Sequence, residues 1–304
     1  MEDQRPKIVI TGGLGFIFSY VVEYYVKKGW HVFVLDNQSE GSHPEIIDGS
    51  FQFLKIDVAE PAVIQVIQDI DPEYVIHAAA ISDVDYSIQN SYKTLSSNIM
   101  ANLNVFEACK TLKNLKKFIY VSTDEVYGEC DHKRQEDELV FPKNPYSCSK
   151  AVGSLMRIAF DNTYKELKDK TAETRFCNVF GGRQDKRKIL PAIKASLEGK
   201  YILPVHNGGN GFREYIYVEN IPPVIDLILE KGNRVYNVTL NDLFSVKQLI
   251  SYAEKLTGKK VKTKESERKG MDNMYQIDNT RIIDLGWTPL YTFEQGMKKY
   301  LCQK

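Results

Sequence analysis

The sequence predicts a doubly wound α/β fold, in which helices cover both faces of a parallel sheet, followed by a smaller C-terminal α/β lobe. Short apolar runs rich in Val and Ile recur along the first 180 or so residues, and longer stretches with helical spacing separate them. Such an alternation of strands and helices builds a parallel sheet. The strands are apolar almost throughout, as expected for a sheet that is buried on both faces.

Six strands are expected in the first part of the chain. They lie at residues 7–11, 31–36, 51–57, 74–80, 117–123 and 173–179. Between them, residues 18–30 and 94–114 carry apolar side chains at helical spacing, which predicts amphipathic helices.

After about residue 180 the rhythm changes to a less regular pattern, with a Gly/Asn cluster at 206–211 and a late amphipathic helix at 245–258. We therefore expect a large first domain at residues 1–177, with a returning segment at about 214–235. Residues 178–213 and 236–304 are expected to form the smaller lobe.

The composition excludes several classes of protein. Forty basic residues balance forty acidic ones, so no net field attracts the chain to nucleic acid or to a membrane. The five cysteines are scattered without a C-x-x-C pair, which argues against a disulfide framework and a zinc site, and no metal is expected. No apolar stretch approaches the roughly 18 residues of a membrane span. We expect a soluble, cytoplasmic protein.

The turn "TGGLGFI" at residues 11–17 follows the first expected strand and opens a helix. In this context a glycine-rich turn holds a dinucleotide pyrophosphate at the helix N-terminus. Asp36 ends the second strand, where a carboxylate accepts the ribose hydroxyls and repels a 2′-phosphate. Residues 37–42 contain no Arg or Lys, so NAD is favoured over NADP. An ordinary turn aspartate at position 36 is the alternative.

Phe18 stands where such a turn normally has its third glycine. That glycine permits close packing of the helix against the strand, so Phe18 is expected to cost packing unless its neighbours make room. The backbone donors near Gly15 and Phe16 do not depend on that side chain. We therefore expect NAD to bind despite Phe18.

Tyr146 and Lys150 are four residues apart in "NPYSCSK", so they share one face of a helix. There the ammonium can lower the pKa of the phenol and hold the cofactor ribose, while Tyr146 takes a hydroxyl proton as hydride leaves. An ordinary exposed helix face explains most such pairs. The position of this one, after the fifth strand of a nucleotide-binding sheet, favours the catalytic interpretation.

Fragments along nearly the whole chain carry a family resemblance. They are "TGGLGFI", "HAAAISDVDYS", "STDEVYG", "NPYSCSK", "RFCNVFGG", "FREYIYVEN", "YNVT" and "LGWTP". The chain resembles the extended short-chain dehydrogenases/reductases, and specifically nucleoside-diphosphate-hexose 4,6-dehydratases of the dTDP- or UDP-glucose type. This implies an NAD-binding Rossmann domain at 1–177 and a substrate-binding lobe after it. Epimerases of the same branch usually carry small or hydroxyl residues where Asp124 and Glu125 stand.

Two adjacent carboxyl groups suit a dehydration. Oxidation of a hexose at C4 makes the C5 proton acidic, so a base removes it while an acid protonates the departing C6 hydroxyl. The resemblance implies Glu125 as base and Asp124 as acid, with Thr123 bonded to the C4 oxygen beside Tyr146. Hydride then returns to C6. The alternative is that "TDE" only starts a helix, with Thr or Asp as its N-cap.

The resemblance also implies the binding residues. For NAD they are Gly12, Gly15, Phe16, Ile17, Asp36, Asn37, Asp57, Val58, Ala78, Ala79, Ala80, Asn98, Tyr146 and Lys150. For the sugar nucleotide they are Ser82, Asp83, Asn178, Lys188, Arg213, Asn237, Arg268 and Tyr275. A guanidinium such as that of Arg213 suits diphosphate oxygens. Each basic residue is equally compatible with a solvated surface charge.

Three positions depart from the dehydratase pattern. Asp83 stands where His is common, Tyr86 where Arg is frequent, and Met274 where an Arg usually precedes Tyr275. These departures put the identity of the sugar and nucleotide in doubt more than the reaction. The segment "GGRQDKRK" offers further cations that could compensate, or that form a flexible exposed loop. They are Arg183, Lys186 and Arg187.

The favoured function is an NAD-dependent 4,6-dehydratase acting on dTDP-glucose, UDP-glucose or an N-acetylated relative. One alternative is a 4-epimerase or a 5,6-dehydratase of the same family, and another is a sugar-nucleotide or NAD binder that has lost turnover. Related proteins pair through two long helices, here about 92–112 and 145–165, so a homodimer is expected by resemblance.

Overall fold

The computed structural model describes residues 5–39, 41–42, 50–267 and 274–302. These residues form a seven-stranded sheet of order β10-β6-β5-β4-β1-β2-β3, in which every pairing is parallel. Its strands are β1 (Lys7–Thr11), β2 (His31–Asp36), β3 (Gln52–Lys55), β4 (Tyr74–His77), β5 (Lys117–Thr123), β6 (Thr171–Phe176) and β10 (Val235–Val238). The predicted doubly wound α/β fold is confirmed.

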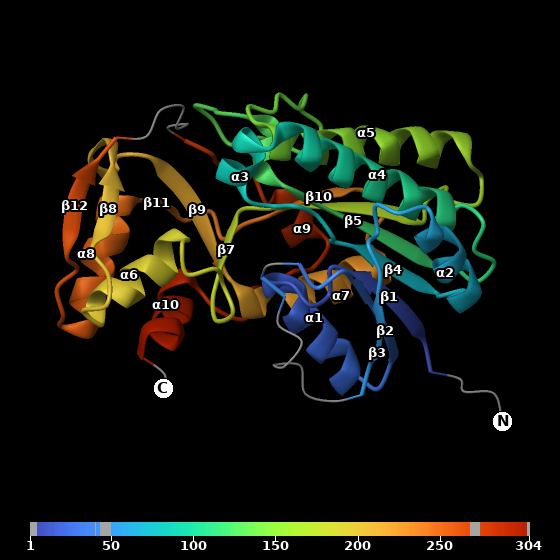
Figure 1. The fold of residues 1–304 in the computed structure, drawn as a ribbon, viewed down its shortest axis with the longest axis horizontal. Helices are drawn as coiled ribbons and strands as arrows, with labels where there is room; N and C mark the ends of the chain where they lie inside the picture. Colours follow the sequence, from blue (N-terminus) through green and yellow to red (C-terminus); the bar gives the residue numbers. More distant parts are fainter. Residues whose placement is uncertain (1–4, 40, 43–49, 268–273, 303–304) are drawn as a thin grey trace.

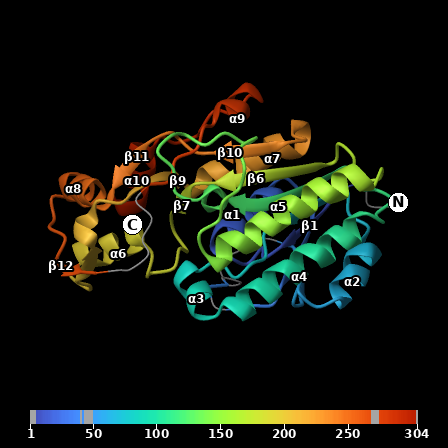
Figure 2. The ribbon, with the colours of Figure 1, turned by 90° about the horizontal axis from the view of Figure 1, so that it is seen from above.

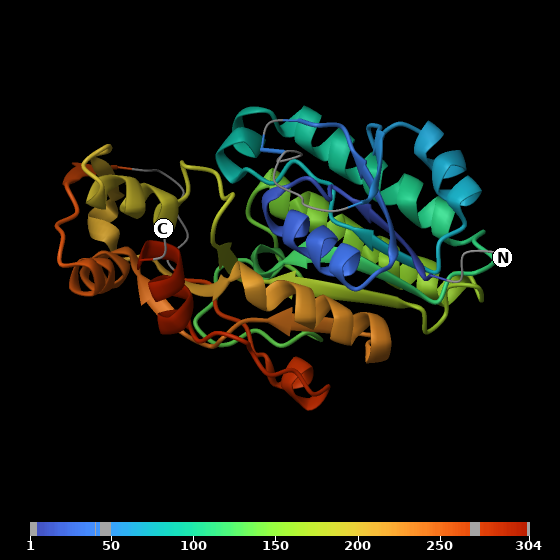
Figure 3. The same cartoon turned by 90° about the horizontal axis from the view of Figure 1, so that it is seen from below.

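Helices cover both faces of this sheet (Figure 1). On one face lie α2 (Ala62–Ile70), α3 (Val84–Gln89), α4 (Ser91–Cys109) and α5 (Pro145–Thr163). Figure 2 shows α4 and α5 running alongside each other over the strands. On the other face lie α1 (Phe16–Lys27) and α7 (Ile221–Lys231), which pack against each other and are seen from below in Figure 3.

Local sequence signals set where these helices begin. Pro145 is the first residue of α5, and Asn144 before it forms a capping box with Ser147. The Asn144 side chain accepts the Ser147 N–H at 2.8 Å, and the Ser147 hydroxyl accepts the Asn144 N–H at 3.2 Å. A capped start of this kind fixes the first turn of the helix, and therefore the direction of Tyr146.

The smaller lobe lies at the left of Figure 1. It contains a three-stranded sheet of β7 (Asn178–Phe180), β9 (Phe212–Tyr217) and β11 (Leu243–Ser245), and a pair of β8 (Leu203–His206) with β12 (Thr263–Ser266). Its helices are α6 (Ile189–Leu197), α8 (Val246–Thr257) and α10 (Phe293–Cys302). The short α9 (Thr280–Asp284) packs against β10 of the large sheet.

Several expected boundaries differ from the structure. The returning segment was expected to begin at about residue 214, but residues 214–217 belong to β9, which pairs with β7 and β11 in the smaller lobe. The run expected as one strand at 173–179 is two strands, because β6 pairs with β5 and β10 whereas β7 pairs with β9 in the other sheet. The return to the large sheet runs through α7 and β10 up to Val238, because Val235–Val238 pair with β6. Residues 236–238, which we had placed in the lobe, therefore belong to the large sheet.

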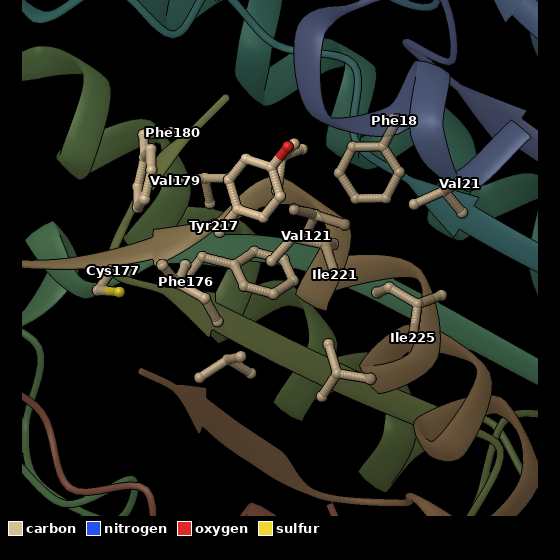
Figure 4. Close-up of a cluster of buried hydrophobic side chains, with 14 of the residues drawn as sticks. Phe18, Val21, Val121, Phe176, Cys177, Val179, Phe180, Tyr217, Ile221 and Ile225 are labelled. Atoms are coloured by element: carbon tan, nitrogen blue, oxygen red, sulfur yellow. The ribbon is translucent and has the colours of Figure 1, made fainter. Parts of the chain in front are cut away.

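Phe18 is a core residue in this fold. Its side chain is only 5% exposed and belongs to the hydrophobic cluster between α1, the large sheet and α7. Figure 4 shows its ring in the same cluster as Tyr217, Val121 and Ile221, all of which are buried. The neighbouring side chains therefore leave room for the Phe18 ring, which fills part of this cluster.

Two features of the described residues bear on the excluded classes. None of their helices combines the length and the apolar character that crossing a membrane requires. They also contain no group of three or more His, Cys, Asp or Glu side chains arranged to hold a metal ion.

Candidate active site

The glycine turn lies where the carboxyl ends of β1 and β4 meet. β1 stands between β4 and β2, so the strand order reverses there, which is where open α/β sheets bind ligands. Gly12 has a φ of +68°, and a Cβ on it would lie 2.7 Å from the Cα of Ala79. Only glycine fits this turn, because a side chain would be strained and would collide with the chain after β4.

The loop after β4 is fixed by buried polar side chains. The Thr11 hydroxyl lies 2.7 Å from Nδ1 of His77, and the N–H of Ala78 donates to the Thr11 carbonyl at 3.2 Å. Asn98 on α4 accepts the Ile81 N–H at 2.8 Å and donates to the Ile81 carbonyl at 3.0 Å. The segment 78–80 is therefore held directly beside the glycine turn.

Asp36 links the glycine turn to the end of β2. Its carboxylate accepts the N–H of Leu14 at 3.1 Å and the N–H of Gln38 at 2.8 Å, and it is 6% exposed. The second bond is the turn role that we considered as the alternative. A carboxylate has about four acceptor positions, so this role leaves capacity for a ribose hydroxyl.

Asp57 follows β3 at the same edge of the sheet. It is exposed and accepts the side-chain amide of Asn37 at 3.2 Å, and Val58 beside it is buried. At the start of α1, the N–H groups of Phe16 and Ile17 belong to the first turn, where a helix supplies no partner of its own. The positive end of a helix, a glycine cradle and an acidic strand end together fit a dinucleotide.

Tyr146 and Lys150 lie in the first two turns of α5, as predicted. Lys150 is 4% exposed and donates to the carbonyl of Val121 at 2.9 Å. Burial lowers the pKa of Lys150 to about 8, against the opposing charge of Glu173. This ammonium is therefore held at the floor of the site, between β5 and α5.

The expected lowering of the Tyr146 pKa is not found. Desolvation of the hydroxyl and the charges of Glu125 and Asp124 hold the pKa of Tyr146 well above its usual range, against a hydrogen bond with Thr123. Lys150 is not among the groups that shift it.

The "TDE" sequence forms the end of β5 and the start of a single 3₁₀ turn, η2 (Asp124–Tyr127). Thr123 is its N-cap and accepts the Glu125 N–H at 3.3 Å, so the alternative capping role is real. The Thr123 hydroxyl also donates to Oδ1 of Asp124 at 3.1 Å. The Glu125 carboxylate accepts the side-chain amide of Asn144 at 2.9 Å, which directs it toward the start of α5.

The two adjacent carboxyl groups lie in different surroundings. Asp124 is 4% exposed, and its Oδ2 is buried with no hydrogen-bond partner in the structure. Burial, and then the charges of Glu125 and Glu214, raise the pKa of Asp124 to about 8. Glu125 is only half-buried. Asp124 is thus suited to act as an acid at neutral pH, as expected for a pair of carboxyls with opposite roles.

The predicted substrate residues come together only in part. Lys188 pairs with Asp83 at 3.5 Å, and Arg187 approaches the same carboxylate at 3.8 Å. Burial favours the neutral form of Asp83, but the Tyr86 N–H and these two cations outweigh it and hold the pKa of Asp83 below its usual value. Ser82, which directly precedes Asp83, is exposed.

A second group lies on the smaller lobe. Arg213 on β9 stacks on the ring of the buried Tyr275, 4.5 Å from the ring centroid. Asn178 is exposed and donates to the Glu214 carbonyl at 3.3 Å. Met274 bridges to Phe212 beside this pair. Arg268 lies outside the described residues.

Asn237 and Arg183 occupy positions that we did not expect. Asn237 is fully buried, and its amide accepts the Tyr127 hydroxyl at 2.9 Å and donates to the Arg134 carbonyl at 2.9 Å. It therefore supports the site from within. Arg183 turns toward α1, where it donates to Ser19 at 3.1 Å and stacks on Tyr20. Lys186 is exposed.

Comparison with known proteins fits this geometry. The family model described as GDP-mannose 4,6 dehydratase matches residues 9–300. The chain belongs to this family. The resemblance to the extended short-chain dehydrogenases/reductases that modify nucleotide sugars is thereby confirmed.

The relatives within this branch differ in activity. The Arabidopsis thaliana trifunctional UDP-glucose 4,6-dehydratase/UDP-4-keto-6-deoxy-D-glucose 3,5-epimerase/UDP-4-keto-L-rhamnose-reductase RHM3 is 32% identical over 98% of this chain and 47% of its own length. The chain thus spans about half the length of that relative. UDP-glucose 4-epimerase of Thermotoga maritima, solved with UDP-glucose, is 29% identical, with a TM-score of 0.89 over 97% of both chains.

A dehydratase structure is equally similar in fold. The dTDP-glucose 4,6-dehydratase DesIV of Streptomyces venezuelae, solved with NAD bound, is 25% identical. Its TM-score is 0.88 over 97% of this chain and 95% of that one. Fold similarity alone therefore does not separate dehydration from epimerisation in this family.

Two residues of the site escaped the sequence analysis. Glu214 is 1% exposed and interacts with Asp124, and Asn144 holds Glu125. A signal existed for both: Glu214 is a charged residue directly before the apolar run "YIYV", and Asn144 directly precedes a helix-starting Pro. Neither signal named a partner, because both partners are distant in sequence.

Proposed function

We propose that this chain catalyses the NAD-dependent dehydration of a nucleoside-diphosphate hexose to the 4-keto-6-deoxy sugar. The observation that carries the proposal is the buried Asp124, whose pKa is raised to about 8, next to a half-buried Glu125, with both carboxyl groups close enough to raise the pKa of Tyr146. An oxidation at C4 needs only Tyr146 and Lys150. Loss of water across C5 and C6 needs an additional acid and an additional base.

The proposed steps assign one proton to each side chain. A bound NAD would supply the acceptor for the C4 hydride and the donor for its return to C6. The positive charge of a bound NAD would favour the phenolate of Tyr146, which then takes the C4 hydroxyl proton, and Thr123 holds the C4 oxygen. Glu125 then removes the C5 proton while Asp124 gives its proton to the C6 hydroxyl, so that the C–O bond breaks and water leaves. After the hydride has returned to C6, Glu125 gives its proton back to C5.

The remaining residues serve binding in this proposal. Backbone N–H groups of Phe16 and Ile17 in the first turn of α1 face the cofactor pyrophosphate, Asp36 takes the adenosine ribose, and Lys150 takes the nicotinamide ribose. Lys188 and Arg213 bind the substrate diphosphate, a task that suits a lysine and a stacked guanidinium. Ser82 and Asn178, both exposed, contact the sugar nucleotide.

The test is the mass of the product. The protein is incubated with NAD and a panel of dTDP- and UDP-hexoses, and loss of one water supports dehydration. A product of unchanged mass in which the C4 configuration is inverted supports the epimerase, the activity of the structurally similar Thermotoga protein. Binding of NAD and sugar nucleotide without turnover supports a binder that has lost activity.

We further propose that the chain forms a homodimer through the outer faces of α4 and α5. Large apolar side chains are exposed there, among them Tyr92 (86%), Leu155 (57%) and Ile158 (45%). Burying such side chains in a helical interface removes apolar surface from water. Light scattering should give twice the chain mass, and Leu155→Glu combined with Ile158→Glu should give the monomer. A wild-type monomer would contradict the proposal.

A further inference from the structure

Glu214 is a buried carboxyl group that the proposed reaction does not use. It is 1% exposed, and it lies on β9 between β7 and β11. Its carboxylate accepts the Ile277 N–H at 2.9 Å. Burial raises the pKa of Glu214 to about 7, although this backbone bond and nearby Thr239 act in the opposite direction. A carboxyl group in this position is costly to bury, so its location calls for a reason.

Strand register brings Glu214 to Asp124. Thr123 pairs with Phe176 between β5 and β6, so the residues after them, Asp124 and Cys177, are neighbours at the carboxyl edge of the sheet. Asn178 pairs with Tyr215 between β7 and β9, which sets Glu214 beside Cys177. Burial raises the pKa of the Cys177 thiol, and the charges of both carboxyl groups raise it further.

We propose that Glu214 is a positioning residue that keeps Asp124 in the acid form. The inference rests on the proposed dehydration, in which Asp124 must hold a proton to release C6 as water. A negative charge next to a buried carboxyl opposes its ionisation. Glu125 supplies one such charge but must itself take up the C5 proton during the reaction. Glu214 takes no part in that transfer, so above about pH 7, where it is ionised, its charge stays in place while Asp124 acts.

Other groups also face this pair. Several groups interact with Asp124 by charge or by a hydrogen bond and change its pKa or have their own pKa changed by it. They are Thr123, Glu125, Cys130, Tyr146, Cys177, Arg213 and Tyr215. The charge of Asp242 raises the pKa of Glu214, and the charge of Lys133 lowers it. Arg213 lowers the pKa of Asp124 and is the weakest of the contributions named for it. The two carboxyl groups therefore titrate as a coupled pair, with Glu214 ionising first as pH rises.

Glu214→Gln tests the inference, because the amide oxygen still accepts the Ile277 N–H while the charge is lost. The matched control is Glu136→Gln. Glu136 is a second buried carboxyl that accepts a backbone N–H, that of Asn237 at 3.0 Å, and it pairs with Arg281. Glu214→Asp retains the charge and serves as the conservative variant.

The first readout is the titration of the Asp124 carboxyl carbon by NMR in the full chain labelled at Asp, with Asp124→Asn assigning the signal. We expect the midpoint to fall by about one pH unit in Glu214→Gln and to remain in Glu136→Gln and Glu214→Asp. An unchanged midpoint in folded Glu214→Gln overturns the inference. This measurement needs no substrate, so its outcome does not depend on whether the chain catalyses the proposed dehydration.

The second readout is the pH profile of water loss. The alkaline limb of kcat should move down with the midpoint, giving about a tenfold lower rate at pH 9 and rates within about twofold of wild type below pH 6.5. Equal loss at every pH indicates a purely structural role and overturns the inference. Should Glu214→Gln not fold, the wild-type titration decides: the Asp124 signal should show a second inflection near pH 7, where Glu214 ionises, and its absence overturns the inference.

Discussion

The proposed catalytic residues at the edge of the large sheet and the proposed substrate residues near the smaller lobe differ in how the fold holds them. Asp124 and Lys150 are each 4% exposed and are fixed from regular elements, by Thr123 and by the Val121 carbonyl. Lys188 has a side chain that is 44% exposed and forms an ion pair with Asp83. The large sheet thus defines one reaction geometry, whereas the substrate side can change partners at little cost in stability.

The largest effect is expected at the base. Glu125→Gln keeps an oxygen for the Asn144 amide but cannot remove the C5 proton, so kcat for water loss should fall by about 10²- to 10⁴-fold. Oxidation at C4 should persist, so reduced cofactor should accumulate and be visible by its near-ultraviolet absorbance. The control is Glu129→Gln, an exposed carboxyl four residues on. Water loss at the wild-type rate would refute the assignment of Glu125.

The next effect concerns the packing beneath the cofactor turn. Phe18→Ala removes a buried ring from the cluster of Figure 4 and should lower the free energy of unfolding by about 3–5 kcal/mol. Urea unfolding measures this loss. Phe53→Ala, at a ring that is 39% exposed on β3, should cost less than about 1 kcal/mol. A Phe18→Ala cost below that of Phe53→Ala would contradict the core role.

The third effect concerns how the buried Asp124 carboxyl changes the free energy of unfolding with pH. The pKa of Asp124 is about 8 when folded, well above that of an unfolded Asp, so its contribution to stability is complete below about pH 4 and is lost as pH rises toward 8. Between pH 5 and 8 the wild type should therefore lose on the order of 3 kcal/mol relative to Asp124→Asn. Urea unfolding at both pH values measures it, and parallel pH dependences would contradict the raised pKa.

The smallest effect is expected on the substrate side. Lys188→Ala should raise KM by about tenfold and leave kcat nearly unchanged, because a binding contact contributes equally to the ground and transition states. Asp83→Asn frees the ammonium from its ion pair and should lower KM, with a stability change within about 1 kcal/mol. Steady-state kinetics on both variants checks the pair. A fall in kcat alone for Lys188→Ala would place that residue in the catalytic region instead.

The sequence by itself determined the parts of this protein that depend on neighbouring residues. The strands 7–11, 31–36 and 117–123 match their predictions residue for residue, because each is an apolar run with clear ends. The glycine turn and the Tyr146–Lys150 pair also lie where they were expected. Backbone propensity, periodicity and turn chemistry act over a few residues, so a single sequence reveals them.

Only the tertiary structure decided which distant side chains share a site. Lys188 meets Asp83 across 105 residues of chain, and strand register alone brings Glu214 to Asp124. The same holds for Phe18, an apparent defect in the turn that the packing of α7 on α1 makes a core residue. The burial of a side chain and the charges around it depend on which distant residues the fold packs against it. A local sequence pattern does not reveal these long-range contacts.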